Sequence, residues 1–309
     1  MVNCKFCNKD FDNDKSLHAH LKSHKISVGD YYQHYYPRKD LLTDELIEFK
    51  NKDQYFDSDF NSKINFKKWA KTSDPKMVGD YCKGLLQKRQ EKKKSIYPFS
   101  QVELKSSGIP SINFLETVIG DYYDYCTNNG FEKKFLNPKN LLLIDSVKDD
   151  YCIYVDTREQ KPLEFSRLTQ VKKLNFGDYC FENLDVSGNT FIERKSLKDF
   201  IGTLAGGYDR FCREIERAAE SNSSVVVVVE NDLATCLRFN YLPYIARNTK
   251  VNPDFIFHKV RSLMTLYKNV QFLFVDGREE CVRVIEKIFI NKDISLNYDL
   301  QLLYDIEKL

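Results

Sequence analysis

Acidic and basic residues recur at short intervals in one part of the chain. Asp156 follows an apolar run, Asp178 follows a glycine, and Glu193-Arg194-Lys195 ends a third apolar run. Residues two apart in a strand share a face, so we expect Glu193 and Lys195 to point one way and Arg194 the other. Carboxylate ligands suit Mg²⁺ or Mn²⁺. The pattern predicts a divalent-metal site at which a lysine orients water or neutralises charge on a phosphate.

Residues next to this pattern fit the same site. Asp199 falls in the first turn of a predicted helix, where the helix dipole favours a carboxylate. Arg194 is expected to brace a carboxylate or touch a phosphate. Clusters of this kind also occur as ordinary surface salt bridges, and the combination of all of them favours a nuclease-type site. Four other acidic residues are interpreted as surface charge: Glu164, Asp185, Glu214 and Glu216.

A second metal motif lies at the N-terminus. The spacing C-x2-C-x12-H-x3-H is formed by Cys4, Cys7, His20 and His24, with apolar Phe11 and Leu17 between them. So short a segment cannot bury enough apolar surface to fold alone, and a tetrahedral Zn²⁺ supplies the missing free energy. Residues 1–25 therefore resemble a ββα zinc finger, and the alternative is a chance grouping of cysteines beside a histidine-bearing helix.

The helix residues of this finger do not identify what the finger binds. The positions that face bases in such fingers are Asn13, Ser16 and Ala19, and none of them is an arginine suited to guanine. One finger also supplies little interface. We therefore expect weak DNA docking or a protein contact rather than sequence-specific regulation.

Composition excludes several classes of protein. The 309 residues are 42% hydrophobic and 14% aromatic, with 47 basic against 45 acidic residues. This balance excludes a disordered polyelectrolyte and a histone-like binder. No apolar run is long enough to cross a membrane, and no secretion signal begins the chain. The nine cysteines are interpreted as reduced thiols. We expect an intracellular protein of the cytoplasm or nucleus.

Positive charge is concentrated in residues 61–94, which hold 11 basic and 3 acidic residues. Such a segment is either a solvated helix face or a contact with a phosphate backbone. The aromatic residues among them, Phe66, Trp69 and Tyr81, fit a stacking surface or the core of a small helical module equally well. The candidate nucleic-acid contacts are Lys67, Lys68, Lys71, Lys88, Arg89, Lys92, Lys93 and Lys94.

Apolar periodicity predicts three parts: a finger (1–25), a mainly helical basic and aromatic region of unknown role (26–150), and an α/β domain with a mixed sheet flanked by helices (151–309). A helix is expected around Phe114–Asn128. In the last part, strands are expected at Tyr151–Asp156, Val171–Phe181, Thr190–Lys195, Val225–Val229 and Gln271–Val275. Helices are expected at Leu197–Glu220 with a break at Gly206-Gly207, at Phe257–Tyr267 and at Glu279–Ile290.

The polar pattern resembles the XPF/Mus-type structure-selective nucleases. Gly177-Asp178, the Glu193-Arg194-Lys195 triplet, Asp199 and the earlier Val155–Glu159 match the motifs of that family, and the resemblance covers about residues 151–275. It implies a restriction-endonuclease-like fold and hydrolysis of DNA phosphodiester bonds with Mg²⁺ or Mn²⁺. By the resemblance, Asp178 and Glu193 are metal ligands and Lys195 is the catalytic lysine. Asp156 and Glu159 support the ion directly or through water, and Arg194 and Asp199 support the active site.

One departure from the family bears on the substrate. Residues 276–309 are too short and too poor in glycine for the tandem helix-hairpin-helix module of the repair enzymes. We therefore expect an endonuclease of repair, recombination, or viral or mobile-element processing whose DNA, branched or single-stranded, is engaged elsewhere. A homodimer or protein partner stays open. The alternatives are a non-catalytic XPF-like scaffold and a zinc-finger nucleic-acid-binding protein.

Overall fold

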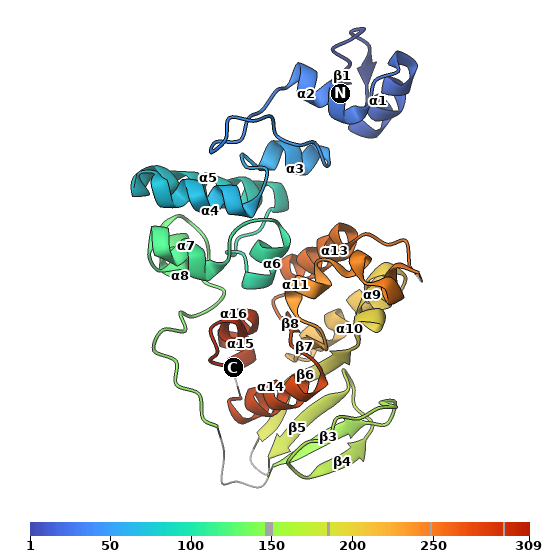
Figure 1. The fold of residues 1–309 in the computed structure, drawn as a ribbon. Helices are drawn as coiled ribbons and strands as arrows, with labels where there is room; N and C mark the ends of the chain where they lie inside the picture. Colours follow the sequence, from blue (N-terminus) through green and yellow to red (C-terminus); the bar gives the residue numbers. More distant parts are fainter. Residues whose placement is uncertain (146–150, 184–185, 248, 293) are drawn as a thin grey trace. The chain divides into compact units, whose positions relative to one another are not determined.

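The computed structural model describes residues 1–309 except 146–150, 184–185, 248 and 293 (Figure 1). The chain divides into two compact units, Met1–Leu85 and Leu86–Leu309. No helix in the described part of the chain has the length and apolar character needed to cross a membrane. All nine cysteines are free thiols.

The first unit begins with a two-stranded hairpin followed by short helices. Its elements are β1 (Val2–Asn3), β2 (Asp10–Phe11), α1 (Asp14–Leu21), η1 (Lys22–His24), α2 (Val28–Tyr35), α3 (Lys52–Asp57), α4 (Lys63–Thr72) and α5 (Pro75–Lys93), the last of which continues into the second unit. Leu17 and Leu21 of α1 share one buried core with Tyr31, Tyr32 and Tyr55. Residues 1–25 are therefore packed against the helices that follow them.

The aromatic residues of α4 and α5 form a second core in this unit. Phe66 and Trp69 are buried. The Trp69 ring lies 5.3 Å from the rings of Phe60 and Tyr81. Of the two expectations for these rings, the structure shows the core of a small helical module.

The second unit is built on a six-stranded mixed sheet with the order β4-β3-β5-β6-β7-β8 (Figure 1). The inner strands β3, β5 and β6 pair antiparallel, whereas β4 runs parallel to β3, and β7 and β8 run parallel to β6. The strands are β3 (Cys152–Asp156), β4 (Thr169–Lys172), β5 (Tyr179–Asn183), β6 (Val186–Lys195), β7 (Ser224–Val229) and β8 (Val270–Phe274).

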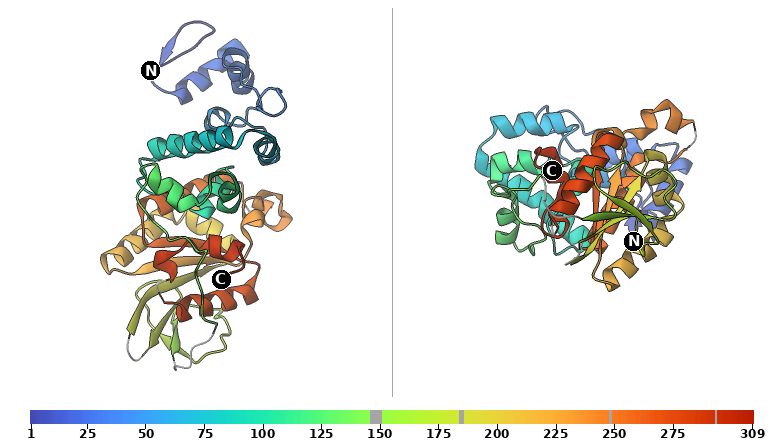
Figure 2. Two further views of the ribbon diagram at one scale, coloured as in Figure 1. Left: turned by 90° about the vertical axis from the view of Figure 1, so that its left-hand side faces the viewer. Right: turned by 90° about the horizontal axis from the view of Figure 1, so that it is seen from below.

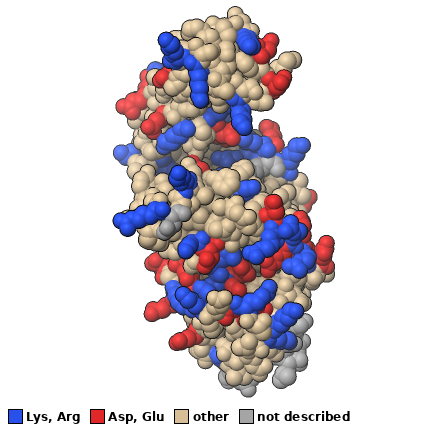
Figure 3. All heavy atoms as spheres, turned by 90° about the vertical axis from the view of Figure 1, so that its right-hand side faces the viewer, with Lys and Arg blue, Asp and Glu red and all other residues tan. Residues whose placement is uncertain are grey.

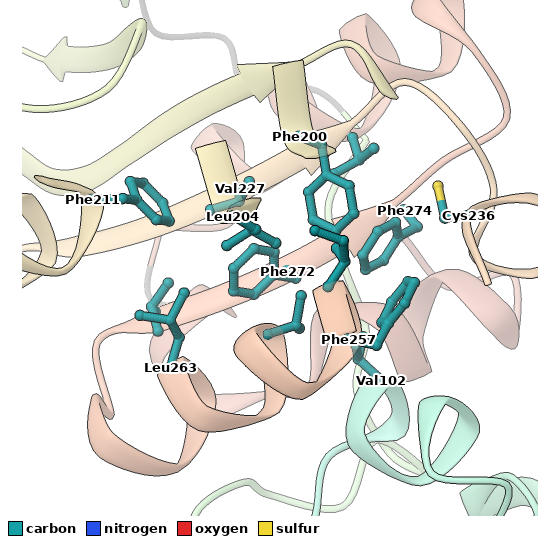
Figure 4. Packing of buried hydrophobic residues seen from close by; sticks show 14 of the residues in the cluster. Val102, Phe200, Leu204, Phe211, Val227, Cys236, Phe257, Leu263, Phe272 and Phe274 are labelled. Atoms are coloured by element: carbon teal, nitrogen blue, oxygen red, sulfur yellow. The ribbon is translucent and has the colours of Figure 1, made fainter. Parts of the chain in front are cut away.

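Helices cover both faces of this sheet (Figure 2). In β7, Val227 packs with the side chains of α9, α10 and α13, whereas Val228 packs with those of α14. This alternation is the period of a strand that is buried on both faces. Figure 4 shows the first of these cores. The helices after β6 are α9 (Leu197–Ala205), α10 (Tyr208–Glu220), α11 (Leu233–Cys236), η2 (Phe239–Tyr241), α12 (Pro243–Ala246), α13 (Pro253–Leu266), α14 (Arg278–Ile290), α15 (Ile294–Asn297) and α16 (Leu300–Asp305).

Three helices from the middle of the chain belong to the same unit: α6 (Gln101–Ser106), α7 (Ile112–Ile119) and α8 (Tyr122–Asn128). The Gln101 N–H donates to the buried Asp299 carboxylate at 2.6 Å, and Lys105 pairs with Asp305 at 2.7 Å. Helix α6 is thereby fixed to α16 and to the residue that caps it. The division at residue 85 thus groups the second half of the expected 26–150 region with the α/β part.

The predicted fold class, a mixed sheet flanked by helices, is confirmed. Two elements are divided where continuous ones were expected. The run Val171–Phe181 forms β4 and β5 with a loop between them. The helix expected at Phe114–Asn128 is two helices, α7 and α8, separated at Gly120, whose φ of +76° is unfavourable for other residues.

Candidate functional site

Asp178 lies where the loop between β4 and β5 enters the sheet. Its N–H donates to the Ile192 carbonyl at 2.7 Å, and its carboxylate Oδ2 accepts the Arg194 N–H at 2.8 Å. The preceding Gly177 has a φ of +60°, and a Cβ there would lie 2.6 Å from the Ile192 carbonyl oxygen. Only glycine permits this close approach, which holds Asp178 against β6.

Glu193 and Lys195 lie on one face of β6, as their spacing predicts. Lys195 Nζ and Glu193 Oε1 form an ion pair of 2.7 Å, and both side chains are largely buried. In the sheet they neighbour Val227 and Val229, which face α9, α10 and α13. The Lys195 ammonium also lies 5.7 Å from the ring of Phe211 in α10. The pair is therefore held between the sheet and α10.

Arg194 points to the opposite face and binds two carboxylates. Its guanidinium contacts Glu159 at 3.0 Å and Glu230 at 2.9 Å, with only 12% of the side chain exposed. Burial opposes the charge, but Glu159 and Glu230 outweigh it and raise the pKa of Arg194. Of the two roles expected for Arg194, this arrangement is the bracing of carboxylates.

Asp156 ends β3 and is almost fully buried. Oδ1 accepts from the backbone N–H and Nε of Arg158, and Oδ2 accepts from the Leu174 N–H at 2.7 Å. Burial raises the pKa of Asp156, but these hydrogen bonds outweigh it and leave the pKa below its usual value. Oδ1 thus holds the loop that directly follows β3, and Oδ2 holds the loop between β4 and β5 that leads to Gly177.

Asp199 lies at the start of α9. Its carboxylate accepts the Ser196 hydroxyl at 2.7 Å, and its N–H donates to Ser196 Oγ, so the two residues cap the helix. The side chain is exposed. Asp199 thus follows the Glu193–Lys195 pair on the next element of the chain, where its carboxylate makes a local helix-capping contact.

The interpretation of Glu214 as surface charge is wrong. Glu214 projects from α10 and is partly buried. Burial and the Glu193 carboxylate raise its pKa, whereas the Gly177 N–H and Lys195 lower it. Glu214 therefore belongs to the same group of charges. In the sequence, its position directly before the buried Ile215 of α10 was the feature that could have indicated partial burial. Glu164 and Glu216 are exposed as expected, and Asp185 lies outside the described residues.

The donor chemistry at this site fits Mg²⁺ or Mn²⁺. Asp178 and Glu193 each engage one carboxylate oxygen in the contacts above, and their mutual repulsion is a cause of the raised pKa of Asp178. Mg²⁺ typically takes one or two protein carboxylates and keeps several waters. Within the described residues, these carboxylates do not form a group of three or more ligands around one point.

The four N-terminal Cys and His residues do form such a group. The ligand atoms of Cys4, Cys7, His20 and His24 all lie within 4.8 Å of one another. Cys7 Sγ lies 3.2 Å from His20 Nε2, which lies 3.0 Å from His24 Nε2. The hairpin β1–β2 carries the cysteines, and α1 and η1 carry the histidines. Two thiols and two imidazoles are a donor set that Zn²⁺ prefers.

The base-facing positions of α1 are partly used within the protein. Asn13 is the N-cap of the helix, and its side chain accepts from both the N–H and the hydroxyl of Ser16. At the same end of the helix, Asp14 pairs with Lys52 of α3 at 2.5 Å. The Asn13 bonds cap the helix, and the Asp14–Lys52 pair holds it against α3.

The basic segment is mostly at the surface. Lys67, Lys68, Lys71, Lys88, Lys92 and Lys94 are exposed, whereas the side chain of Lys93 lies outside the described residues. Arg89 instead donates to the hydroxyl and carbonyl of Ser107. Acidic and basic side chains lie interspersed on the face drawn in Figure 3. The lysines are placed where a phosphate could reach them, and Arg89 stabilises its own unit.

The segment that holds the carboxylates and Lys195 matches a known domain. Residues 155–288 match the ERCC4 domain. Two solved structures are similar, XPF from Aeropyrum pernix and the same protein in complex with DNA. Their identities are 22% and 23%, each over 44% of this chain, with TM-scores of 0.33 and 0.32. The match covers 64% and 61% of those chains, less than two thirds of either. No curated protein matches the chain.

The close approach at Gly177 makes a sharp prediction. Gly177→Ala is expected to lower the free energy of unfolding by about 2 kcal/mol, because the new Cβ meets the Ile192 carbonyl at a positive φ. Urea unfolding of the two proteins measures the difference. Gly202→Ala in α9 is the control, since nothing lies within 4 Å of its Cβ and alanine favours a helix. Equal losses in both variants would contradict the argument.

The charges around Asp178 predict a pH dependence. Burial and Glu193 raise the pKa of Asp178 to about 7, so the folded protein holds this proton more tightly than the unfolded chain. The stability from this group is present below the ordinary carboxyl pKa of about 4 and is lost as the pH rises through 7. Without added Mg²⁺ or Mn²⁺, Asp178→Asn should therefore raise the free energy of unfolding at pH 8 by on the order of 2 kcal/mol.

The effect of the same variant should be about a third as large at pH 5, because only part of the loss between pH 4 and pH 7 has occurred there. Asp276→Asn is the control, because that side chain is exposed. Urea unfolding at both pH values separates the cases. An effect of Asp178→Asn that is the same at pH 5 and pH 8 would contradict the prediction.

Proposed function

We propose that this chain is a metal-dependent DNA endonuclease that hydrolyses phosphodiester bonds. The observation that carries the proposal is the meeting of Asp178, Glu193 and Lys195 where β5 begins and β6 ends, inside a segment that matches the ERCC4 domain. The XPF neighbour in complex with DNA is consistent with DNA as the substrate. Repair, recombination and viral or mobile-element processing are the settings that suit such an enzyme.

Asp178 and Glu193 are the residues that would hold Mg²⁺ or Mn²⁺. When bound, the ion supplies charge stabilisation at the phosphate and a more acidic water. Asp178 is kept in position by the Arg194 N–H and by Gly177, and Glu193 by its pair with Lys195. Asp156 and Glu159 support these residues through the loop and through Arg194.

Lys195 is the residue whose positive charge acts at the scissile phosphate. Its ammonium lies between Glu193 and the Phe211 ring, so the position from which it donates hydrogen bonds is fixed. From there it orients a water or neutralises the negative charge that develops on the phosphate oxygens. Glu214 adds a third carboxylate to this environment.

The N-terminal group is proposed to be a structural zinc site. Its ligand set and the ββα order of its elements support a zinc finger. Because the finger helix shares a core with Tyr31 and Tyr32, the ion stabilises the neighbouring helices as well. The finger and the exposed lysines of α4 and α5 are candidate contacts for DNA or for a protein partner.

The nuclease is tested on a labelled panel of single strand, duplex, flap, splayed arm and four-way junction. We expect cleavage that requires added Mg²⁺ or Mn²⁺. Asp178→Asn and Glu193→Gln should each reduce the rate by on the order of a hundredfold or more, because each loses a charged metal ligand. Asp276→Asn, which changes an exposed carboxylate, should cleave like the wild type.

Two outcomes would overturn the proposal that the chain is a nuclease. One is cleavage that persists in both site variants, which would indicate a contaminant or another site. The other is no cleavage of any substrate by folded protein, with or without a protein partner, in which case the non-catalytic scaffold is the better description.

The zinc site is tested by metal content. Purified protein should contain about one zinc per chain, and Cys7→Ser should lose most of it because one of four ligands is gone. Residues 1–57 should then become sensitive to limited proteolysis. Cys212→Ser, in the second unit, is the matched control. Unchanged zinc in Cys7→Ser would refute the site.

A further inference from the structure

A basic segment without acidic residues follows β7. Between Asp232 and Asp254 the sequence carries Arg238, Arg247 and Lys250 and no aspartate or glutamate. All three basic side chains are exposed. In a chain whose total charges are balanced, this segment is locally attractive to a polyanion.

Aromatic rings are exposed in the same place. Tyr241 is 79% exposed, Tyr244 57% and Phe255 46%. In the described part of the chain, the one other aromatic side chain with comparable exposure is Phe6. Exposed rings interleaved with cations are what single-stranded nucleic acid requires, because unpaired bases stack on rings and phosphates approach the cations.

The segment is anchored firmly enough to present these rings. Phe239 and Ile245 are buried in the core beneath it, together with Leu233 and Cys236. The Arg247 N–H donates to the Pro243 carbonyl at 3.2 Å, which continues the turn of α12. Tyr244 and Arg247 are three residues apart on that turn and therefore lie on one side of it. A ring and a cation are thus presented together.

The segment also starts at the candidate active site. Glu230, the residue after β7, donates its N–H to the Lys195 carbonyl at 3.0 Å and pairs with Arg194. Its far end leads into α13, where the Lys259 ammonium lies 3.9 Å from the Tyr208 ring and 5.7 Å from the Phe255 ring. Tyr208 begins α10, the helix that carries Glu214. Both ends of the segment therefore join elements of the site.

We propose that the surface formed by Arg238, Tyr241, Tyr244, Arg247, Lys250 and Phe255 binds single-stranded DNA beside the candidate active site. Unpaired bases stack on Tyr241, Tyr244 and Phe255, and Arg247 and Lys250 contact the phosphates. The choice of DNA rests on the proposed nuclease function, whereas binding itself does not require cleavage. The surface favours an unpaired arm over plain duplex, because paired bases do not expose their faces to side chains.

The test is the fluorescence anisotropy of a labelled oligonucleotide of about 20 nucleotides, a length that exceeds typical single-strand sites, with the full chain and no added Mg²⁺ or Mn²⁺. Tyr241→Ala/Tyr244→Ala should weaken single-strand binding about tenfold or more. Tyr241→Phe/Tyr244→Phe keeps the rings and should bind within about twofold of the wild type.

Charge is tested separately from stacking. Arg247→Glu/Lys250→Glu should weaken binding and reduce its salt dependence, because fewer counterions are released. Lys133→Glu reverses an exposed lysine outside the segment and should have little effect. Circular dichroism of each variant confirms that it is folded.

Three results would overturn the proposal. The first is unchanged binding of single-stranded DNA by the double alanine variant. The second is that this variant binds single strand and duplex equally more weakly than the wild type. The third is that it loses binding to anionic lipid vesicles or to a protein while its binding to single-stranded DNA is kept. Failure of the nuclease is a separate result. If no substrate is cleaved but the alanine and phenylalanine variants bind as expected, the binding surface stands and the enzyme does not.

Discussion

The alternation of side chains along β6 is the constraint on which the site depends. Successive residues of a strand point to opposite faces, so one triplet delivers Glu193 and Lys195 to α10 and Arg194 to Glu159 and Glu230. Without the guanidinium on the far face, both of these carboxylates would lose a cation, and Glu230 would keep its pair with Arg278. The Arg194 N–H in addition holds Asp178. A shift of β6 by one residue would exchange the two faces and abolish every one of these contacts.

The approach of Asp178 to this strand explains the glycine before it. A positive φ and a carbonyl 2.6 Å from the position of a Cβ are conditions that only glycine meets. The result is a carboxyl group forced close to Glu193 and out of water, which raises its pKa to about 7. Such crowding lowers stability in the absence of a cation and strengthens the binding of one. The lower stability of the protein without a cation is therefore the cost of a preorganised anionic site.

Strand and helix periods made much of the second unit predictable. The Val225–Val229 run, the break at Gly206-Gly207 and the shared face of Glu193 and Lys195 all follow from local patterns, and each is present. What local patterns do not contain is the packing of one element on another. The sequence predicts that Glu214 lies at the surface, but the packing of α10 on β6 partly buries it. It likewise predicts that Arg89 belongs to a basic run, but Arg89 bonds Ser107. The division of Val171–Phe181 into two strands likewise follows from packing, because β4 and β5 lie on opposite sides of β3.

Burial decides which aromatic residues are available to a ligand. Trp69 lies among basic residues in sequence, yet its ring is enclosed by Phe60, Phe66 and Tyr81. Tyr241 lies in an unremarkable sequence context, yet most of its surface meets solvent. A ring that already contributes to a core cannot stack on a base without unfolding its module, whereas an exposed ring loses only its hydration. The exposed rings of the segment after β7 are therefore the ones that the proposed stacking on unpaired bases uses, and the exposed lysines of α4 and α5 are suited to phosphates.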